Sequence, residues 1–298
     1  METGRPAITV HTMMGHKHIA LGAKCLGSLV RCSQDPVRVI VHEDGSVSES
    51  DKEEFCAAVP NSSFVMKADA DVQMNEFLYK YPACKHLRDT LVFGLKIFDI
   101  QVLGSGENLA YTDCDILFLK NFSNLFRMPP DPNAGGVFMR DPLQAYCLRS
   151  TQLLLTRKLK LADRLNGGLL YFRRSAFDWD LVEWFLTHSQ FEVHPYWKEQ
   201  TAWSVLAAAT RSWMWSEKQV RVITSERDFD SDLVVAHFVS NYRNLLDKAP
   251  EMDSVGAPPS EIEAARGGYC TFPMLLMDEL RREGRRRGVV PDRRRTLV

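Results

Sequence analysis

The stretch LAYTDCDILFL, residues 109–119, is an apolar run interrupted by two carboxylates, Asp113 and Asp115. Side chains two residues apart on an extended segment point to the same face. Because two like charges are unfavourable in apolar surroundings, we expect them where a strand ends and opens to solvent, with a cation between them. Oxygen ligands on a rigid strand end suit Mg²⁺ or Mn²⁺ holding a diphosphate. The alternative is a pair of turn carboxylates that follow a strand.

The composition limits the classes of protein to be considered. With 298 residues, the chain is long enough for one large domain or two ordinary ones. A formal net charge of -1 offers no argument for nucleic-acid binding. Seven scattered cysteines without metal-ligand spacing favour a reduced, cytoplasmic protein over a disulfide framework. No apolar run reaches the length of a signal peptide or a membrane span, so the chain is expected to be soluble.

Alternating strand and helix patterns surround the central stretch. Ser50 and Glu53 have the spacing of a capping box and should begin a helix. Alternation of this kind is typical of an α/β protein with a mostly parallel central sheet flanked by helices. On the N-terminal side, strands are expected at 7–11, 37–42 and 64–66, and helices at 18–32, 50–59 and 74–102, the last interrupted at Pro82.

Polar residues gather at the ends of these predicted strands. In open α/β sheets, ligands bind beyond the carboxyl ends of the strands. The residues expected at that edge are His11, Glu43, Asp44, Asp113 and Asp115. Their agreement with the rule is the first indication of a site.

The C-terminal half continues the same pattern. Ser260 and Glu263 have capping-box spacing, so the last helix should begin there. We therefore expect one α/β domain over residues 1–258, followed by a C-terminal helix and an arginine-rich tail over residues 259–298. Before that division, strands are expected at 135–141, 166–172, 219–223 and 233–238, and helices at 180–188 and 199–210.

Several side chains outside the central stretch could take part in chemistry, and each also has an ordinary structural explanation. His237 ends a late strand, where it could be a third, nitrogen ligand to the cation or a satisfied core histidine. Asn166 precedes two glycines, where its amide could bind sugar hydroxyls or form a tight turn. Glu199 and Gln200 begin a helix, where they could line a site or serve only as N-terminal helix residues.

Basic side chains offer possible anion contacts. Lys96 is near the buried face of its helix and could reach an anion or extend to solvent. Arg243 could reach phosphate oxygens, although a surface arginine is the simpler interpretation. The C-terminal arginine run follows an apolar segment and is either solvated or docked on an anionic membrane surface. Its members are Arg281, Arg282, Arg285, Arg286, Arg287, Arg293, Arg294 and Arg295.

Taken together, these residues resemble a known enzyme family. Residues 111–117, YTDCDIL, resemble the DxD motif of metal-dependent glycosyltransferases with the GT-A fold. The NGG sequence at 166–168 resembles their Asn-Ala-Gly element, and the Glu-Gln pair at 199–200 resembles their acidic-Gln pair. His237, followed six residues later by Arg243, resembles a late histidine with a basic partner. The order and spacing are similar to those of the retaining branch related to glycogenin and the bacterial lipooligosaccharide galactosyltransferases.

The resemblance extends over residues 8–245 and implies a role for each matching side chain. Gly167 stands where the family usually has Ala, Glu199 stands where it usually has Asp, and the usual Gly-x-x-Lys-Pro-Trp continuation after the histidine is absent. Asp113, Asp115 and His237 would bind Mn²⁺ or Mg²⁺. The implied donor-binding residues are His11, Thr12, Asp44, Lys96, Asp113, Asn166, Gly167, Gly168 and Arg243, and the implied catalytic residues are Glu199 and Gln200.

The implied reaction is the metal-dependent transfer of a hexose from a UDP-sugar to an acceptor hydroxyl, with retention of configuration. The acceptor would be a carbohydrate, a glycolipid or a protein. Two other interpretations stay open. An aspartate-nucleophile phosphohydrolase also has a DxD motif over Mg²⁺, but that class predicts the motif after the first strand. A non-catalytic carbohydrate-binding relative would keep the same fold.

Overall fold

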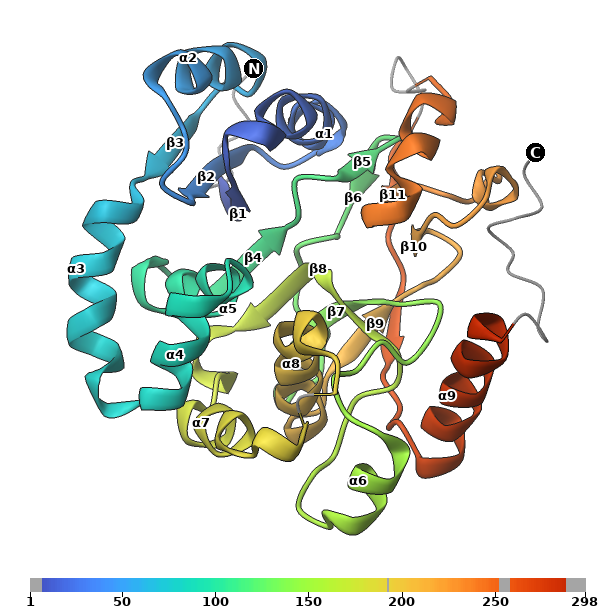
Figure 1. Cartoon of the computed structure of the whole chain (residues 1–298). Helices are drawn as coiled ribbons and strands as arrows, with labels where there is room; N and C mark the ends of the chain where they lie inside the picture. The colour runs from blue at the N-terminus through green and yellow to red at the C-terminus, as the bar shows by residue number, and fades with distance from the viewer. Residues whose placement is uncertain (1–6, 192, 252–257, 288–298) are drawn as a thin grey trace.

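An eight-stranded mixed sheet runs through the computed structural model, which describes residues 7–191, 193–251 and 258–287 (Figure 1). β8 and β13 run opposite to the other strands of this sheet, which are mutually parallel. The predicted α/β architecture with a mostly parallel sheet is therefore confirmed. In order across the sheet the strands are β13 (Ala264–Arg266), β9 (Trp213–Trp215), β7 (Gly136–Arg140), β8 (Leu165–Arg173), β4 (Asn108–Thr112), β1 (Ile8–Met14), β2 (Val37–Glu43) and β3 (Ser62–Val65).

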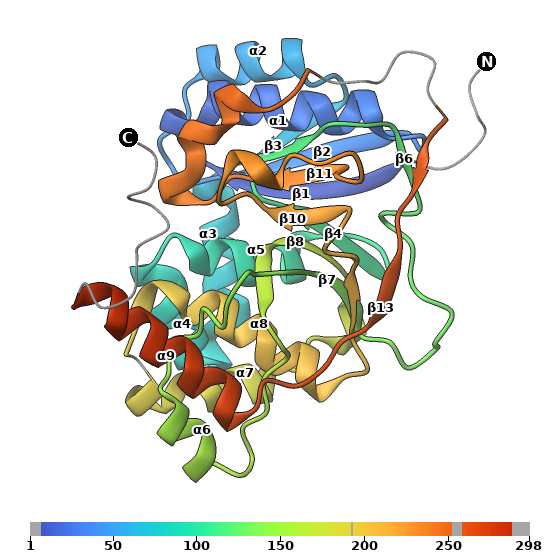
Figure 2. The ribbon, with the colours of Figure 1, turned by 90° about the vertical axis from the view of Figure 1, so that its right-hand side faces the viewer.

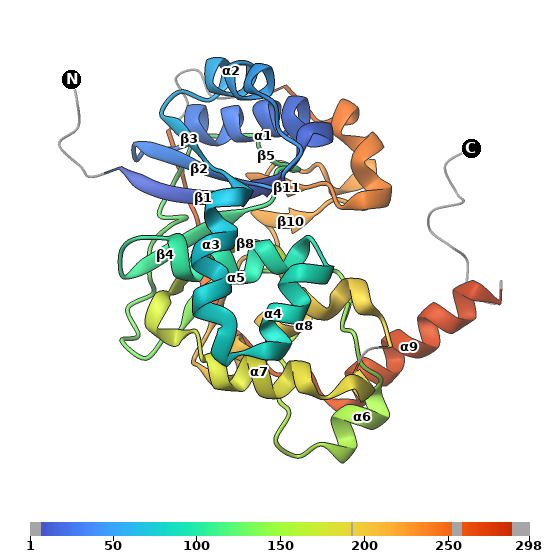
Figure 3. The same cartoon turned by 60° about the vertical axis from the view of Figure 1, so that its left-hand side comes forward.

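Helices cover both faces of the sheet, and each face has its own apolar core (Figures 2 and 3). On one face, α1 (Ile19–Cys32) and α2 (Glu49–Ala58) bury side chains such as Leu26 and Phe55. On the other, the core includes Phe98 and Trp203. The helices of that second face include α3 (Lys67–Phe77), α4 (Pro82–Thr90), α5 (Phe93–Leu103), α7 (Trp179–Thr187) and α8 (Lys198–Ala209).

The N-terminus of α2 differs from the sequence prediction. Ser48 is the N-cap, its hydroxyl accepts from the Asp51 backbone N–H, and the Asp51 carboxylate accepts from the Ser48 backbone N–H. The predicted capping box of Ser50 and Glu53 is therefore wrong by two residues. Asp51 has a further partner, because its carboxylate lies 2.9 Å from Nδ1 of His16. That contact between distant parts of the chain favours the earlier cap.

The apolar run that contains the two aspartates forms two strands. β4 ends at Thr112, and β5 (Ile116–Phe118) leaves the central sheet. β5 pairs instead with β11 (Val235–His237) in a small sheet that also contains β10 (Val220–Val222). Asp113, Cys114 and Asp115 form the link between the sheets, so the expectation that the carboxylates follow the end of a strand is confirmed.

The C-terminal segment contributes more to the sheets than expected. Ser260–Glu261 is strand β12, which pairs with β6 (Phe122–Ser123), and β13 lies at one edge of the central sheet. The last helix, α9 (Phe272–Arg286), begins twelve residues after Ser260, so the predicted start at Ser260 is wrong. The division of the chain at residue 258 stays a prediction, and Arg293, Arg294 and Arg295 lie outside the described residues. No described helix has both the length and the apolar character needed to cross a membrane.

Candidate functional site

The link between β4 and β5 brings the two aspartates beside His237. The Asp113 backbone N–H donates to the Gly168 carbonyl on β8 (2.7 Å), and the Asp115 carbonyl accepts from the Phe238 N–H after β11 (3.0 Å). Nε2 of His237 is then 3.2 Å from Asp115 Oδ1 and 3.7 Å from Asp113 Oδ2. One ligand atom from each residue fits within 4.8 Å of the others, which is the arrangement of a three-residue cation site.

Asn166 fixes which nitrogen of His237 carries the proton. Its Nδ2 lies 2.9 Å from a carboxylate oxygen of Asp141, and its Oδ1 accepts from the Gly168 N–H (2.8 Å). If the amide were reversed, its oxygen would face the Asp141 carboxylate and its NH₂ group would face the Gly168 N–H, and neither contact could be a hydrogen bond. Oδ1 is therefore also the atom that accepts a hydrogen bond from Nδ1 of His237, 3.1 Å away. When Nδ1 carries the only ring proton, Nε2 presents a lone pair to the two carboxylates. Three electron-rich ligand atoms facing one another call for a cation between them.

Gly168 lets His237 approach β8 closely. A Cβ atom at this position would lie 2.3 Å from Cε1 and 2.6 Å from Nδ1 of the His237 ring. Any side chain there would displace the imidazole. The glycine predicted to be part of the site thus has a clear steric reason to be a glycine.

Arg243 balances part of the acidic charge. Its Nε and Nη2 atoms donate to Asp115 Oδ2 at 3.0 and 2.8 Å, and Nη1 lies 3.3 Å from Nε2 of His18. Burial alone would raise the pKa of Asp115, but the hydrogen bonds and positive charge of the Arg243 guanidinium help to hold that pKa below its ordinary value. Asp115 is therefore ionised, as a metal ligand must be.

Lys96 connects the DxD motif to α8. Its Nζ lies 3.0 Å from Asp113 Oδ1 and 3.6 Å from Glu199 Oε1. The Tyr111 hydroxyl donates to Asp113 Oδ1 (2.8 Å). Burial raises the pKa of Glu199 to about 7, even though the nearby Lys96 ammonium opposes that shift. Glu199 is therefore a carboxyl group that can hold or release a proton near neutral pH.

Gln200 is brought into the same cluster by both ends of its amide. Oε1 accepts from the Gly167 N–H at 3.3 Å, and Nε2 donates to the Ala145 carbonyl at 3.1 Å. The structure thus gathers most of the residues singled out from the sequence around one point. These are Lys96, Asp113, Asp115, Asn166, Gly167, Gly168, Glu199, Gln200, His237 and Arg243.

Among the described residues, three expected donor-binding residues have no side-chain hydrogen bond or ion pair to that cluster. β1 continues to Met14, so His11 is inside the strand rather than at its end, and its Nδ1 lies 2.9 Å from His42 Nε2. Thr12 is fully buried, with no hydrogen-bond partner for its hydroxyl among the described residues. Asp44 does follow the end of β2, where its carboxylate binds Ser46. Their roles in donor binding stay predictions.

Sequence reasoning missed three residues of the cluster. Tyr111 reads as a core aromatic inside the motif, His18 as the residue preceding a helix, and Asp141 as the charged end of a strand. The alternation of apolar and polar residues says nothing of partners so far away along the chain. The only usable signal was at Asp141, the charged last residue of the strand predicted over 135–141.

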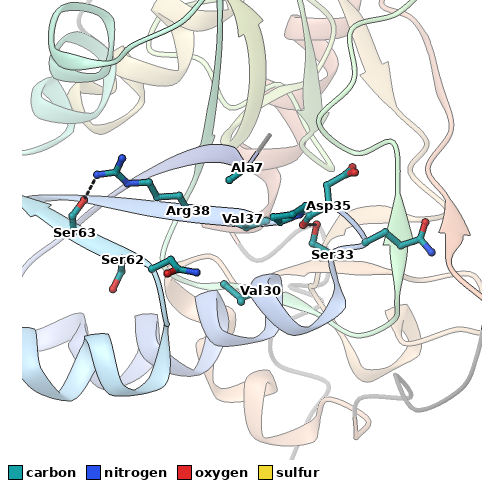
Figure 4. Close-up of a pocket in the computed structure, with 11 residues that line it drawn as sticks. Ala7, Val30, Ser33, Asp35, Val37, Arg38, Ser62 and Ser63 are labelled. Carbon is teal, nitrogen blue, oxygen red and sulfur yellow. Dashed lines mark hydrogen bonds between the residues drawn. The ribbon is translucent and has the colours of Figure 1, made fainter. Parts of the chain in front are cut away.

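An open cavity of about 570 Å³ lies at the opposite edge of the sheet (Figure 4). It is lined by residues at the amino ends of β2 and β3, including Val37 and Ser62. Arg38 and Ser63 point toward each other there, 3.5 Å apart. None of the candidate site residues lines this cavity, so chemistry rather than cavity size identifies the candidate site.

Comparison with solved structures identifies the fold. The galactosyltransferase LgtC in complex with donor and acceptor sugar analogs has a TM-score of 0.54 and 12% identity, over 78% of this chain and 87% of that one. Mouse xyloside xylosyltransferase 1 in its apo form has a TM-score of 0.56 and 11% identity, over 80% of this chain and 99% of that one. No protein-family model and no curated protein matches the sequence. The chain has the GT-A fold, as the DxD resemblance predicted.

Proposed function

We propose that the chain is a metal-dependent glycosyltransferase that transfers a hexose from a UDP-sugar to an acceptor hydroxyl. One observation carries the proposal: Asp113, Asp115 and His237 direct ligand atoms to one point, with the histidine lone pair set by Asn166. The position of this cluster on a GT-A fold supports the same conclusion. A phosphohydrolase with an aspartate nucleophile is disfavoured, because its motif would follow the first strand rather than β4.

The cluster fits a divalent cation. Asp113, Asp115 and His237 would hold Mn²⁺ or Mg²⁺, which would neutralise the diphosphate as it leaves. Arg243 carries a partly exposed guanidinium beside Asp115, where it would bind the same phosphate oxygens. The neighbouring side chains would then act on the sugar.

Glu199 and Gln200 begin α8 beside Gly167 and would line the transferred sugar. The Glu199 carboxylate, adjacent to Lys96, would stabilise positive charge at the anomeric carbon as the bond to the diphosphate breaks. Acceptor attack on the same face would retain the configuration, and the departing phosphate would take the acceptor proton. A reducing, cytoplasmic setting is part of the proposal, because no disulfide joins any of the seven cysteines, all of which lie in the described residues.

Donor turnover tests the proposal directly. The protein would be incubated with a panel of UDP- and GDP-sugars, with and without Mn²⁺, while released nucleoside diphosphate is followed. We expect slow, metal-dependent hydrolysis of one donor, abolished in Asp115→Ala and unchanged in Asp232→Ala, an exposed carboxylate before β11. Absence of donor release and binding, together with cleavage of a generic phosphate ester, would replace the transferase with the phosphohydrolase. Proton NMR of the transferred product would show whether the anomeric configuration is retained.

We also propose that α9 contacts an anionic membrane surface that presents the acceptor. Met277 and Leu280 expose about half of their surface, Arg281 lies exposed on the same helix, and the exposed Arg287 directly follows its end. An apolar stripe beside cations fits anionic lipid. We expect binding to vesicles that contain phosphatidylserine, weakened in Leu280→Glu and unchanged in Val72→Glu on α3. Equal binding to neutral vesicles would contradict the electrostatic part of this proposal.

A further inference from the structure

Gly167 lies directly against the carboxylate of Glu199. A Cβ atom built at Gly167 would lie 2.9 Å from Oε1 and 3.2 Å from Oε2 of Glu199. Contacts this short are rare between real atoms, so a methyl group at this position and the observed Glu199 side chain would exclude each other. The Glu199 carboxylate therefore occupies the volume that a side chain at position 167 would need.

The backbone around Gly167 cannot move away to relieve such a contact. Pairing between β7 and β8 jumps from Phe138 opposite Leu170 to Met139 opposite Asn166, so residues 167–169 bulge out of the ladder. The bulge is held on both sides: the Gly167 N–H donates to Gln200, and the Gly168 carbonyl accepts from the Asp113 N–H. The Glu199 side chain would therefore have to move instead.

Glu199 is held where its carboxylate could meet a ligand. The side chain is nearly fully buried, and Lys96 Nζ is 3.6 Å from Oε1, beyond hydrogen-bond length. Within the described part of the chain, Oε1 has no hydrogen-bond donor. A buried carboxylate oxygen without a donor is unfavourable unless a ligand supplies one. A sugar hydroxyl is the donor that the proposed function would supply.

We propose that Gly167 is a positioning residue whose missing side chain allows the longer Glu199 to reach Lys96 and present Oε1 to a hydroxyl of the donor sugar. This inference rests on the proposed function for its ligand.

A double-mutant cycle tests the pair. Gly167→Ala and Glu199→Asp should each lower kcat/KM for metal-dependent donor hydrolysis by about tenfold or more. The double variant should have a kcat/KM about tenfold higher than the product of the two single losses predicts, because the shorter aspartate leaves room for the methyl group. Gly168→Ala is the matched control: its Cβ meets His237 rather than Glu199, so Glu199→Asp should not rescue it.

A second cycle, on urea unfolding, separates this inference from the proposed function. The steric contact alone predicts that the two substitutions are non-additive in unfolding free energy, whether or not any donor is turned over. If wild type hydrolyses no donor but the two substitutions are non-additive in unfolding free energy, the proposed function fails, and only the packing contact between Gly167 and Glu199 is supported. If wild type hydrolyses a donor but the losses in kcat/KM simply add, the positioning role of Gly167 is overturned.

Discussion

His237 and His11 are both almost fully buried, and each has one ring nitrogen beside a neighbouring side chain. Nδ1 of His237 lies 3.1 Å from Asn166 Oδ1, and Nδ1 of His11 lies 2.9 Å from His42 Nε2. Their opposite nitrogens differ. Nε2 of His237 faces the carboxylates of Asp113 and Asp115, whereas Nε2 of His11 has no hydrogen-bond partner among the described residues.

The surroundings explain why only one of these histidines is prepared for a ligand. Burial lowers the pKa of His11 to about 4 and that of His42 to about 3, and the Arg88 charge adds to the shift at His42. The pair therefore stays neutral at neutral pH. Around His237, the negative charge of the carboxylates is only partly balanced by Arg243, and a bound cation can balance the rest. Nearby carboxylates, rather than burial, distinguish a ligand site from a structural histidine.

Removing a carboxylate ligand should have the largest effect, because it makes the cluster more like the histidine pair. Asp115→Asn keeps the size of the side chain but removes the charge that a cation needs. We expect the affinity for Mn²⁺ to fall by about 100-fold or more, as titrated by the EPR signal of free Mn²⁺. The exposed Asp232→Asn should bind as wild type does. Unchanged Mn²⁺ binding in Asp115→Asn would mean that the cluster is not a metal site.

Releasing His237 from its orienting amide should have the next largest effect. Asn166→Ala removes the acceptor for Nδ1–H, so the imidazole is free to rotate or to change tautomer. Loss of such an outer contact typically lowers metal affinity by about 10- to 100-fold. The same EPR titration would measure the loss, with the exposed Asn133→Ala as the control. Equal affinity in both variants would show that β11 alone orients the ring.

The same contrast shows what a sequence can and cannot reveal about this molecule. Asp113 and Asp115 were predictable as a strand-end pair because charge directly follows an apolar run. The position of His11 inside β1 was not, because the threonine and methionines that continue the strand resemble a loop next to Gly15. Its contact with His42 depends on the register between β1 and β2. Distant pairing of this kind leaves no local pattern.

The C-terminal segment illustrates the same limit. Ser260 and Glu263 have the spacing of a helix cap, yet Ser260 pairs with Phe122 in a short parallel ladder. A tertiary partner overrides local propensity there. The GT-A fold was predictable because the order of strands, DxD motif and late histidine spans most of the chain. The Asn166–Asp141 contact that orients the site was not, because it joins side chains on different strands.

The histidine pair should make stability depend on pH in a defined direction. In the unfolded chain both rings titrate near 6.5, but in the folded protein they take up protons only near pH 4 and 3. The unfolded state therefore binds more protons below pH 6.5, and stability falls as the pH decreases from 6.5 toward 4. Each ring contributes a slope of up to about 1.4 kcal/mol per pH unit.

Urea unfolding between pH 7 and 4 would measure that slope. The double variant His11→Leu/His42→Leu removes both titrating rings and replaces them with apolar side chains of similar size, so its slope should be shallower. His86→Leu removes an exposed histidine and should leave the slope as in wild type. If the double variant lost as much stability between pH 7 and 4 as wild type does, another group would be responsible for the loss of stability in acid.

The smallest effect is expected where the charge of the cluster is kept and only its geometry changes. Arg243→Lys retains one positive charge beside Asp115 but replaces two donated hydrogen bonds, at 3.0 and 2.8 Å, with a single ammonium. The arginine side chain is 41% exposed, so solvent screens part of the interaction. We expect donor KM to rise by only about two- to fivefold. Arg221→Lys, at a surface pair with Asp230, should leave KM unchanged.

Arg243→Met separates charge from geometry at the same position. Without the positive charge, the pKa of Asp115 should rise toward its ordinary value, so Mn²⁺ binding should weaken first at acidic pH and least above neutrality. A pH series of the EPR titration on Arg243→Met and Arg243→Lys would show the difference. If Arg243→Lys lost as much affinity as Arg243→Met, the forked geometry of the guanidinium would matter more than its charge. The cluster would then depend on directed hydrogen bonds, as the neutral His11–His42 contact does, rather than on opposite charges.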